Sequence, residues 1–197
     1  MKSNVVAFPT REEPLPATGP VKIYLGSNQN PMQGYINVDI EKFPGVDVVC
    51  DLEKPWPWPD NHADEIYTAD LPEHLREWWD EYDVAAAQTV EDIKQALLHP
   101  RRVYGIIHFM NECWRVLKPG GLLRAKIPTT ENSKAWAQDP THVSYWNENT
   151  FLYFIEGGYG GIYPHLIKAK FQPVDIRTLI PNNRGESWVL AVLRKPA

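Results

Sequence analysis

Three aspartates stand at the ends of successive segments that the sequence predicts to be β-strands. Asp39 lies at the end of segment 35–40, Asp51 follows segment 46–50, and Asp70 follows segment 63–69. The carboxyl ends of parallel strands meet at one edge of a sheet. We therefore expect the three carboxylates to converge on a polar ligand at that edge.

A glycine turn precedes the first of these aspartates. Segment 21–25 is rich in β-branched and aromatic residues and is predicted to be a buried strand, and Gly26 follows it directly. Glycine lets a backbone turn sharply and approach a ligand closely. Strand, glycine turn, strand and acid together form the start of a nucleotide-type site. The pattern is incomplete, because Asn28 stands where a fuller Gly-x-Gly motif has its second glycine.

Strands and helices alternate along the rest of the chain. Prolines interrupt residues 1–20, which are predicted to be an extended leader, and residues 21–197 are predicted to be a single domain. The connection 27–34 is too short for a helical crossover, so either the usual first helix is reduced to a turn or the two flanking strands are not neighbours in a parallel sheet. The α/β alternation that follows favours the reduced helix. Segment 72–98 is helix-prone, with Trp78, Trp79 and Tyr82 on an amphipathic surface and a separate short helix over 88–98.

The second half of the chain completes the predicted sheet. Apolar residues at helical spacing predict a helix over 103–117, which Pro119 and the two glycines after it end. A strand is predicted over 122–127, and segments 171–180 and 188–193 are predicted to form an antiparallel pair. The predicted fold is therefore an α/β sandwich with a mostly parallel sheet and an antiparallel C-terminal strand pair.

Composition restricts the class of protein and its partners. The 197 residues are 43% hydrophobic and 23% charged, which is typical of a soluble globular protein. The net charge of -5 argues against a broad nucleic-acid interface, although a local basic patch leaves nucleic acid open as a partner. The sequence has no recognisable signal peptide and no apolar stretch long enough to span a bilayer, which predicts a cytoplasmic location.

The sequence predicts no metal site. Cys50 and Cys113 lie in apolar segments and are expected to be reduced core residues. The other available ligands lack the tight spacing of a motif such as H-E-x-x-H: His74, Asp139, His142 and His165.

Several motifs together resemble a known family. The chain is similar to small class I S-adenosylmethionine-dependent methyltransferases, in the group close to the methyltransferase-11 type. The resemblance covers roughly residues 21–154 and is carried by these segments: Leu25–Gly26, Gly34–Asp39, Val46–Leu52, Pro57–Asn61, Asp64–Ile66, Glu73–Leu75, Asn111–Gly121 and Asp139–His142. The string from Arg115 to Gly121 is the most specific of them, and the Gly26 turn is the least.

The resemblance implies a fold and a set of contacts to S-adenosylmethionine. The fold would be the Rossmann-like class I methyltransferase sandwich. Gly26 and Ser27, with Asn28 in the same turn, would approach the methionine part of the cofactor, and Asp39 would accept hydrogen bonds from the ribose hydroxyls. The remaining contacts would come from two pairs of residues: Asp51 and Leu52 at the adenine, and Asp70 and Leu71 beside the methyl-transfer centre.

Methyl transfer to a hydroxyl or an amine also benefits from a base that removes a proton. The candidate bases are His142, His74 and Asp70. In the alternative interpretation, Asp139 and His142 only hold a loop in place through hydrogen bonds, and His74 makes a structural bond at the start of a helix.

The resulting hypothesis is an S-adenosylmethionine-dependent methyltransferase that acts on an oxygen or nitrogen of a sugar, a nucleoside or a small metabolite. The main alternative is a protein that binds S-adenosylmethionine without transfer activity, because the glycine motif is degenerate. A nicotinamide-dependent oxidoreductase ranks last, since the G-x-G-x-x-G motif is absent. The sequence leaves the acceptor and the oligomeric state open.

Overall fold

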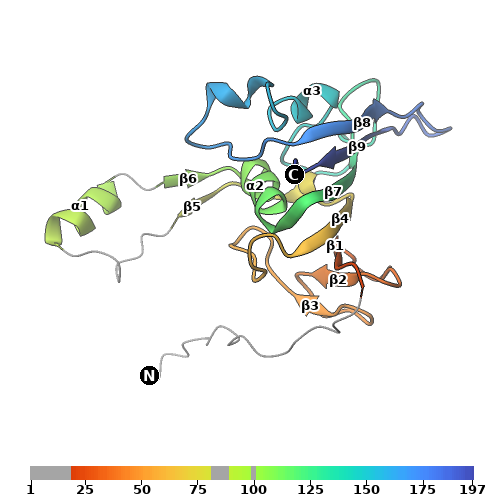
Figure 1. The fold of residues 1–197 in the computed structure, drawn as a ribbon. Coiled ribbons are helices and arrows are strands. Elements are labelled where there is room, and N and C mark those ends of the chain that lie inside the picture. Colours follow the sequence, from red (N-terminus) through yellow and green to blue (C-terminus); the bar gives the residue numbers. More distant parts are fainter. Residues whose placement is uncertain (1–18, 81–88, 99–100) are drawn as a thin grey trace, which may run out of the picture.

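The computed structural model describes residues 19–80, 89–98 and 101–197. Its centre is a seven-stranded sheet (Figure 1). The strands are β1 (Lys22–Leu25), β2 (Ile36–Asp39), β3 (Val48–Val49), β4 (Ala63–Ala69), β7 (Leu117–Pro128), β8 (Gln172–Thr178) and β9 (Trp188–Arg194). Their order across the sheet is β3-β2-β1-β4-β7-β9-β8.

The direction of the strands confirms the predicted topology. β1 pairs in parallel with β2 and β4, β3 extends β2 in parallel, and β4 pairs in parallel with β7. β9 then pairs antiparallel with both β7 and β8. The sheet is therefore mostly parallel and ends in an antiparallel C-terminal pair. Most of the predicted leader, residues 1–18, lies outside the described residues.

The connection between β1 and β2 contains no helix, as its length predicted. The backbone N–H groups of Gly26 and Ser27 both donate to the carbonyl oxygen of Val38, at 2.9 and 3.0 Å. These bonds fix the turn directly onto the neighbouring strand. Gly26 has a φ of 74° and Asn28 a φ of 47°, so both residues adopt the left-handed conformation that Gly and Asn tolerate best.

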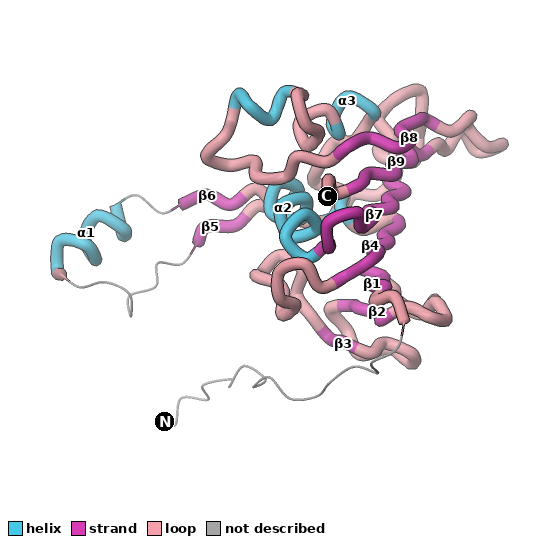
Figure 2. The backbone as a smooth tube through the Cα atoms, in the orientation of Figure 1, coloured by secondary structure: helices cyan, strands magenta, loops and turns pink. Residues whose placement is uncertain are grey.

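The helices are α1 (Val90–Leu98), α2 (Gly105–Val116) and α3 (Glu148–Phe151), with 3-10 turns η1 (Pro72–His74) and η2 (Tyr159–Ile162). α2 buries Phe109, Met110 and Cys113 against the sheet, and Figure 2 shows α2 crossing it. In the described part of the chain, no helix is long and apolar enough to cross a membrane.

The prediction of a helix at Trp78 and Trp79 is wrong. The structure places both residues in β5 (Trp78–Asp80), which pairs antiparallel with β6 (Arg101–Val103). Bulky aromatic residues are favoured in strands. The backbone hydrogen bonds of β5 are made with β6, a strand distant in sequence, which the local pattern that predicted a helix could not reveal. Tyr82, the third aromatic residue of that pattern, lies outside the described residues.

Only one face of the sheet carries the hydrophobic core. Along β4 and β7, buried Ile66, Leu123 and Ile127 point to the side of α2, whereas Tyr67 and Arg124 alternate to the other side. Parallel strands covered on both faces are usually apolar throughout. The alternation here accounts for a second face that mixes charged residues with tyrosines and aliphatic residues and that no helix of the described segments covers (Figure 1).

Arg115 fastens the proline- and tryptophan-rich loop to α2. Its guanidinium donates to both carboxylate oxygens of Glu112 at 2.7 Å and to the carbonyl oxygens of Trp56 and Trp58 at 3.3 and 2.7 Å. It also donates to Asp60 at 3.0 Å. A planar fork of five donors suits this set of acceptors, and lysine could not replace it.

We expect Arg115→Met to lower the free energy of unfolding by about 2 kcal/mol, because two loop carbonyls lose their donor and the largely buried Glu112 carboxylate is left with the backbone N–H of Trp56. Urea denaturation measures the change. Arg124→Met is the matched control, since the ion pair of Arg124 with Glu65 is more exposed and its loss should cost only about 0.5 kcal/mol. Equal losses in the two variants would contradict this account of the loop.

Candidate active site

The turn after β1 and the acid at the end of β2 form one unit. The backbone N–H of Asn28 donates to Oδ2 of Asp39 at 2.8 Å, and the backbone N–H of Glu41 donates to Oδ1 at 3.2 Å. The side chain of Asp39 is therefore held from both sides at the carboxyl edge of the sheet. A carboxylate oxygen has two acceptor positions, so each oxygen of Asp39 retains one for a ligand hydroxyl.

Leu71 lies directly over the glycine turn. A Cβ built on Gly26 would lie 3.0 Å from Cβ of Leu71, so a larger residue at position 26 would force the two loops apart. Ser27 is fully buried beside this contact, and its hydroxyl has no hydrogen-bond partner among the residues described. The structure thus brings together the turns after β1 and β4 at the carboxyl edge of the sheet.

Asp51 and Leu52, the two predicted adenine contacts, differ in how far their side chains are exposed. Asp51 is half-buried, and its Oδ1 accepts a hydrogen bond from the backbone N–H of Glu53 at 2.9 Å. Leu52 is 5% exposed and belongs to the hydrophobic core, and its carbonyl oxygen accepts a hydrogen bond from Nε1 of Trp56 at 3.2 Å. In this conformation only a small part of Leu52 is available to a ligand.

Asp70 is directed toward β9 and β7. Its Oδ1 accepts a hydrogen bond from Nε1 of Trp188 at 2.6 Å, and its Oδ2 lies 3.7 Å from Nζ of Lys126. Its φ of 51° is unusual for a residue other than glycine. Both carboxylate oxygens are thus paired with residues of the neighbouring strands, so Asp70 is the least suited of the three predicted bases in this geometry.

The other two predicted bases come together. The imidazole rings of His74 and His142 are 4.6 Å apart and nearly perpendicular. The loop that carries His142 is bound to η1, because the backbone N–H groups of Val143 and Ser144 donate to the carbonyl oxygen of Glu73 at 2.8 and 3.2 Å. Each ring places its Nε2 near Oε1 of Glu73, at 3.9 Å for His74 and 3.8 Å for His142.

The hydrogen-bond network fixes which nitrogen of each ring carries a proton. Nδ1 of His142 lies 2.8 Å from the carbonyl oxygen of Trp136, which only accepts, so this Nδ1 is the donor. The Thr141 hydroxyl donates its single proton to Oδ1 of Asp139 at 2.6 Å and must therefore accept from Nδ1 of His74 at 3.0 Å. In their neutral forms, both rings thus present the Nε2 lone pair toward Glu73.

Glu73 is a functional candidate that sequence reasoning missed. Its side chain is fully buried, and neither carboxyl oxygen has a hydrogen-bond partner in the described part of the molecule. Burial raises its pKa to about 8. Burial also lowers the pKa of His74, and the nearby His142 adds to the effect. The only sequence signal was the Glu73–His74 pair, which does not reveal that His142 is a neighbour.

A pocket of about 500 Å³ adjoins this cluster. Leu75 follows the cluster residue His74 in the chain, and Val143 follows His142, so the two segments that carry the histidines also form part of the pocket wall. Tyr104 and Tyr145 add aromatic rings, and Arg76 and Glu77 add charge. The pocket offers an aromatic and polar surface of the size that a small molecule requires.

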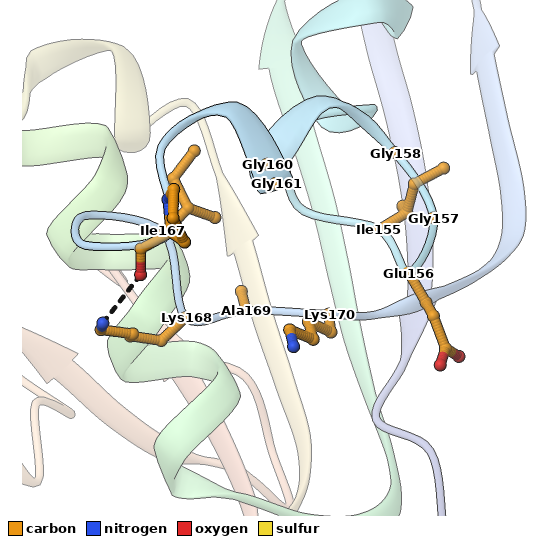
Figure 3. A pocket seen from close by; sticks show the side chains of 11 residues that line it. Ile155, Glu156, Gly157, Gly158, Gly160, Gly161, Ile167, Lys168, Ala169 and Lys170 are labelled. Atoms are coloured by element: carbon orange, nitrogen blue, oxygen red, sulfur yellow. Dashed lines mark hydrogen bonds between the residues drawn. The ribbon is translucent and has the colours of Figure 1, made fainter.

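A second pocket, of about 560 Å³, lies between residues 155–161 and 164–170 (Figure 3). Its wall is rich in glycine, and Nζ of Lys168 donates to the carbonyl oxygen of Pro164 across one end at 2.9 Å. None of its lining residues is a predicted cofactor or catalytic residue. The pocket is therefore a separate feature from the edge formed by β1, β2 and β4.

No protein-family model matches the sequence. No curated protein matches it significantly either. Solved structures do match the fold. One is a SAM-dependent methyltransferase from Archaeoglobus fulgidus, with 14% identity and a TM-score of 0.52 over 90% of this chain and 87% of that one.

Two further structures have the same fold at a TM-score of 0.50 and 13% identity. One is the N-methyltransferase NodS from Bradyrhizobium japonicum, solved with S-adenosyl-L-homocysteine. The match covers 90% of this chain and 79% of the NodS chain. The other is the cyclase SpnF, for which the match covers 91% of this chain and 75% of the SpnF chain. At such identity the likeness establishes the fold alone. The strand order and these matches together show that the chain has the Rossmann-like fold of class I methyltransferases.

Proposed function

We propose that this protein is an S-adenosylmethionine-dependent methyltransferase that acts on an oxygen or nitrogen of a small-molecule acceptor such as a sugar, a nucleoside or a metabolite. The observation that carries the proposal is Asp39, a half-buried carboxylate held by backbone N–H groups at the end of β2 with acceptor positions to spare. Ligands of open α/β sheets commonly bind at this edge, which supports the proposal.

The residues at the edge fit the cofactor. Asp39 would accept hydrogen bonds from both ribose hydroxyls, and the turn of Gly26 and Ser27 would lie against the methionine part. Asp51, with the edge of Leu52, would face the adenine, and Leu71 would line the methyl-transfer centre. The unpartnered hydroxyl of buried Ser27 is a polar group at this turn for which a ligand could provide a partner.

The acceptor would occupy the pocket between Leu75, Tyr104 and Tyr145, whose wall includes the residues that follow His74 and His142 in the chain. When bound, the cofactor supplies the methyl group and the sulfonium leaving group. Positioning of the acceptor and exclusion of water are then the main tasks of the chain. Nε2 of His142 or His74 would accept the proton that the acceptor loses, because hydrogen bonds at Nδ1 leave Nε2 as the basic nitrogen of each ring.

A methyl-transfer assay tests the proposal. The protein is incubated with methyl-labelled S-adenosylmethionine and separate pools of sugars, nucleosides and small metabolites, and label in the acceptor and release of S-adenosylhomocysteine are both measured. We expect both signals with one acceptor pool. If the protein binds the cofactor but labels no pool, the result favours a binding protein without transfer activity. That alternative draws support from the match to a cyclase, since the same fold serves other chemistry.

The degenerate glycine motif makes a separate prediction at Asn28. Its bond to Asp39 uses the backbone N–H, and glycine readily adopts the same left-handed conformation. Asn28→Gly should therefore leave the S-adenosylmethionine affinity within about threefold of the wild type. Asn28→Val should lower the free energy of unfolding by about 1–2 kcal/mol and weaken cofactor binding, because a β-branched residue resists this conformation.

Isothermal titration and urea denaturation of both variants check the prediction. A large gain in cofactor affinity in Asn28→Gly would mean that the asparagine impairs the site, as the binding-protein alternative holds. Equal behaviour of the Gly and Val variants would show that the turn does not position Asp39.

A further inference from the structure

Glu73, His74 and His142 form a cluster in which, with the carboxyl group of Glu73 ionised, every group is an acceptor. Both rings direct an Nε2 lone pair toward the carboxyl group, and the carboxylate itself has no N–H or O–H donor among the residues that the structure describes. A fully buried carboxylate without a compensating partner is costly. A bound cation would satisfy all three groups at once.

The distances are close to those of a metal site. The potential ligand atoms of the three residues all lie within 4.8 Å of one another. Bonds of about 2.0–2.1 Å in a tetrahedral zinc site separate neighbouring ligand atoms by about 3.4 Å. The Glu73–His142 and Glu73–His74 separations of 3.8 and 3.9 Å therefore require only small side-chain rotations to close around an ion.

The surroundings of the histidines are also those of metal ligands. A metal-binding histidine usually donates its second ring N–H to a carbonyl or another oxygen, which fixes the tautomer and the ring orientation. His142 does so to the carbonyl oxygen of Trp136, and His74 does so to the Thr141 hydroxyl, which is itself bound to Asp139. Oδ2 of Asp139 lies 3.8 Å from Nε2 of His142 and adds negative charge at the rim.

The cluster is accessible from one side. The side chain of Glu73 is fully buried and that of His142 is 6% exposed, whereas that of His74 is 34% exposed. An ion can therefore enter past His74 and reach the carboxylate at the base. Two imidazoles and a carboxylate are a common ligand set for divalent transition metals, and such a set leaves coordination positions open.

We propose that Glu73, His74 and His142 bind one divalent transition-metal ion, with zinc as the representative ion. The site does not depend on S-adenosylmethionine. If the proposed function is also correct, Glu73, His74 and His142 would hold the ion, and the ion rather than a free imidazole would activate the acceptor hydroxyl.

The test measures metal binding directly in the full chain. Purified protein is depleted of metal with a chelator, titrated with zinc, and tested with cobalt as a spectroscopic probe of coordination. We expect one ion per chain, visible cobalt absorption with imidazole coordination, and a higher unfolding midpoint on zinc addition, because an ion that binds only the folded state stabilises it. No stoichiometric binding of either ion would overturn the proposal.

Three variants identify the ligands. In His142→Asn, the amide nitrogen can replace Nδ1 in the bond to Trp136 while Nε2 is removed, so the loop is retained and the ligand is lost. His74→Asn and Glu73→Gln remove the other two ligands. Each should weaken zinc binding at least about tenfold and abolish the zinc-induced rise in the unfolding midpoint. His165→Asn, which removes an exposed histidine outside the cluster, should change neither.

Unchanged zinc binding in the three cluster variants, with a loss in His165→Asn, would show surface binding only and overturn the proposal. Cofactor titration of the same variants separates this result from the proposed function. The Asp39 site lies on other residues, so a protein that binds S-adenosylmethionine but no metal would contradict the metal site alone.

Discussion

Asp39→Asn is expected to weaken S-adenosylmethionine binding about 100-fold. A hydrogen bond to a charged group contributes about 1.5–3 kcal/mol, and each 1.4 kcal/mol is a factor of ten in affinity. The asparagine keeps the size of the side chain and one acceptor oxygen, but it replaces the other oxygen with a donor. That donor would face the N–H of Asn28 or Glu41, or a ribose hydroxyl, instead of accepting from them. Isothermal titration of the two proteins measures the difference.

Asp47→Asn is the matched control for this substitution. Asp47 also accepts a backbone hydrogen bond, from Asn37 at 2.7 Å, but it precedes β3 rather than ending a strand at the carboxyl edge. Asp47→Asn should change the free energy of unfolding without changing the affinity for S-adenosylmethionine. If Asp39→Asn binds S-adenosylmethionine as tightly as the wild type does, Asp39 is only a cap for the two turns.

The second large effect concerns the histidine cluster. Once an acceptor has been found, His142→Asn should lower the rate of methyl transfer about 10²–10⁴-fold and leave cofactor affinity unchanged. The substitution retains the donor to the Trp136 carbonyl and removes Nε2, which either accepts the proton or holds the ion. Single-turnover rates with saturating cofactor measure the effect.

The comparison with His142→Ala separates chemistry from loop structure. Alanine removes both ring nitrogens, so it should also loosen the loop bound to Glu73 and lower the unfolding midpoint. If the role of His142 is purely structural, His142→Asn should be active and stable, whereas His142→Ala should be neither. His165→Asn should retain full activity, since its side chain is outside the cluster and the acceptor pocket.

Much of the sheet could be predicted from local sequence patterns. The segment 63–69 is β4 with the same bounds. The helix predicted over 103–117 is α2, but it ends at Val116, and Pro119 and the two glycines that were expected to end it lie in β7. Trp78 and Trp79 could not be assigned in this way, because their strand exists only through its pairing with β6. The predicted single-domain boundary and the cytoplasmic location remain predictions.

The candidate site was only partly predictable for the same physical reason. Asp39 follows from the rule that parallel strands end at one edge, which a single sequence can reveal. The relation of Glu73 to His142 depends on a loop docking onto η1 across a long stretch of chain. Motif spacing along the sequence therefore indicated no metal site, whereas the structure places three ligand-type residues together.

The second face of the sheet, which no helix of the described segments covers, was also only partly predictable. The alternation of Tyr67 with Ile66 and of Arg124 with Leu123 is visible in the sequence. Its meaning depends on knowing that these strands lie in the middle of a parallel sheet, where both faces are usually apolar. The alternation of residues and the central position of β4 and β7 in the sheet are both needed to recognise that one face is left without a helix.

The most direct test of the central claim is backbone amide NMR of the labelled full chain, titrated with S-adenosylmethionine and S-adenosylhomocysteine. The account predicts saturable shifts at the amides of Gly26–Asn28, Asp39–Glu41 and Asp51–Glu53, with the pocket at residues 155–170 unaffected (Figure 3). Shifts confined to residues 155–170, or no shifts with either ligand, would contradict a cofactor site at the carboxyl edge of β1 and β2.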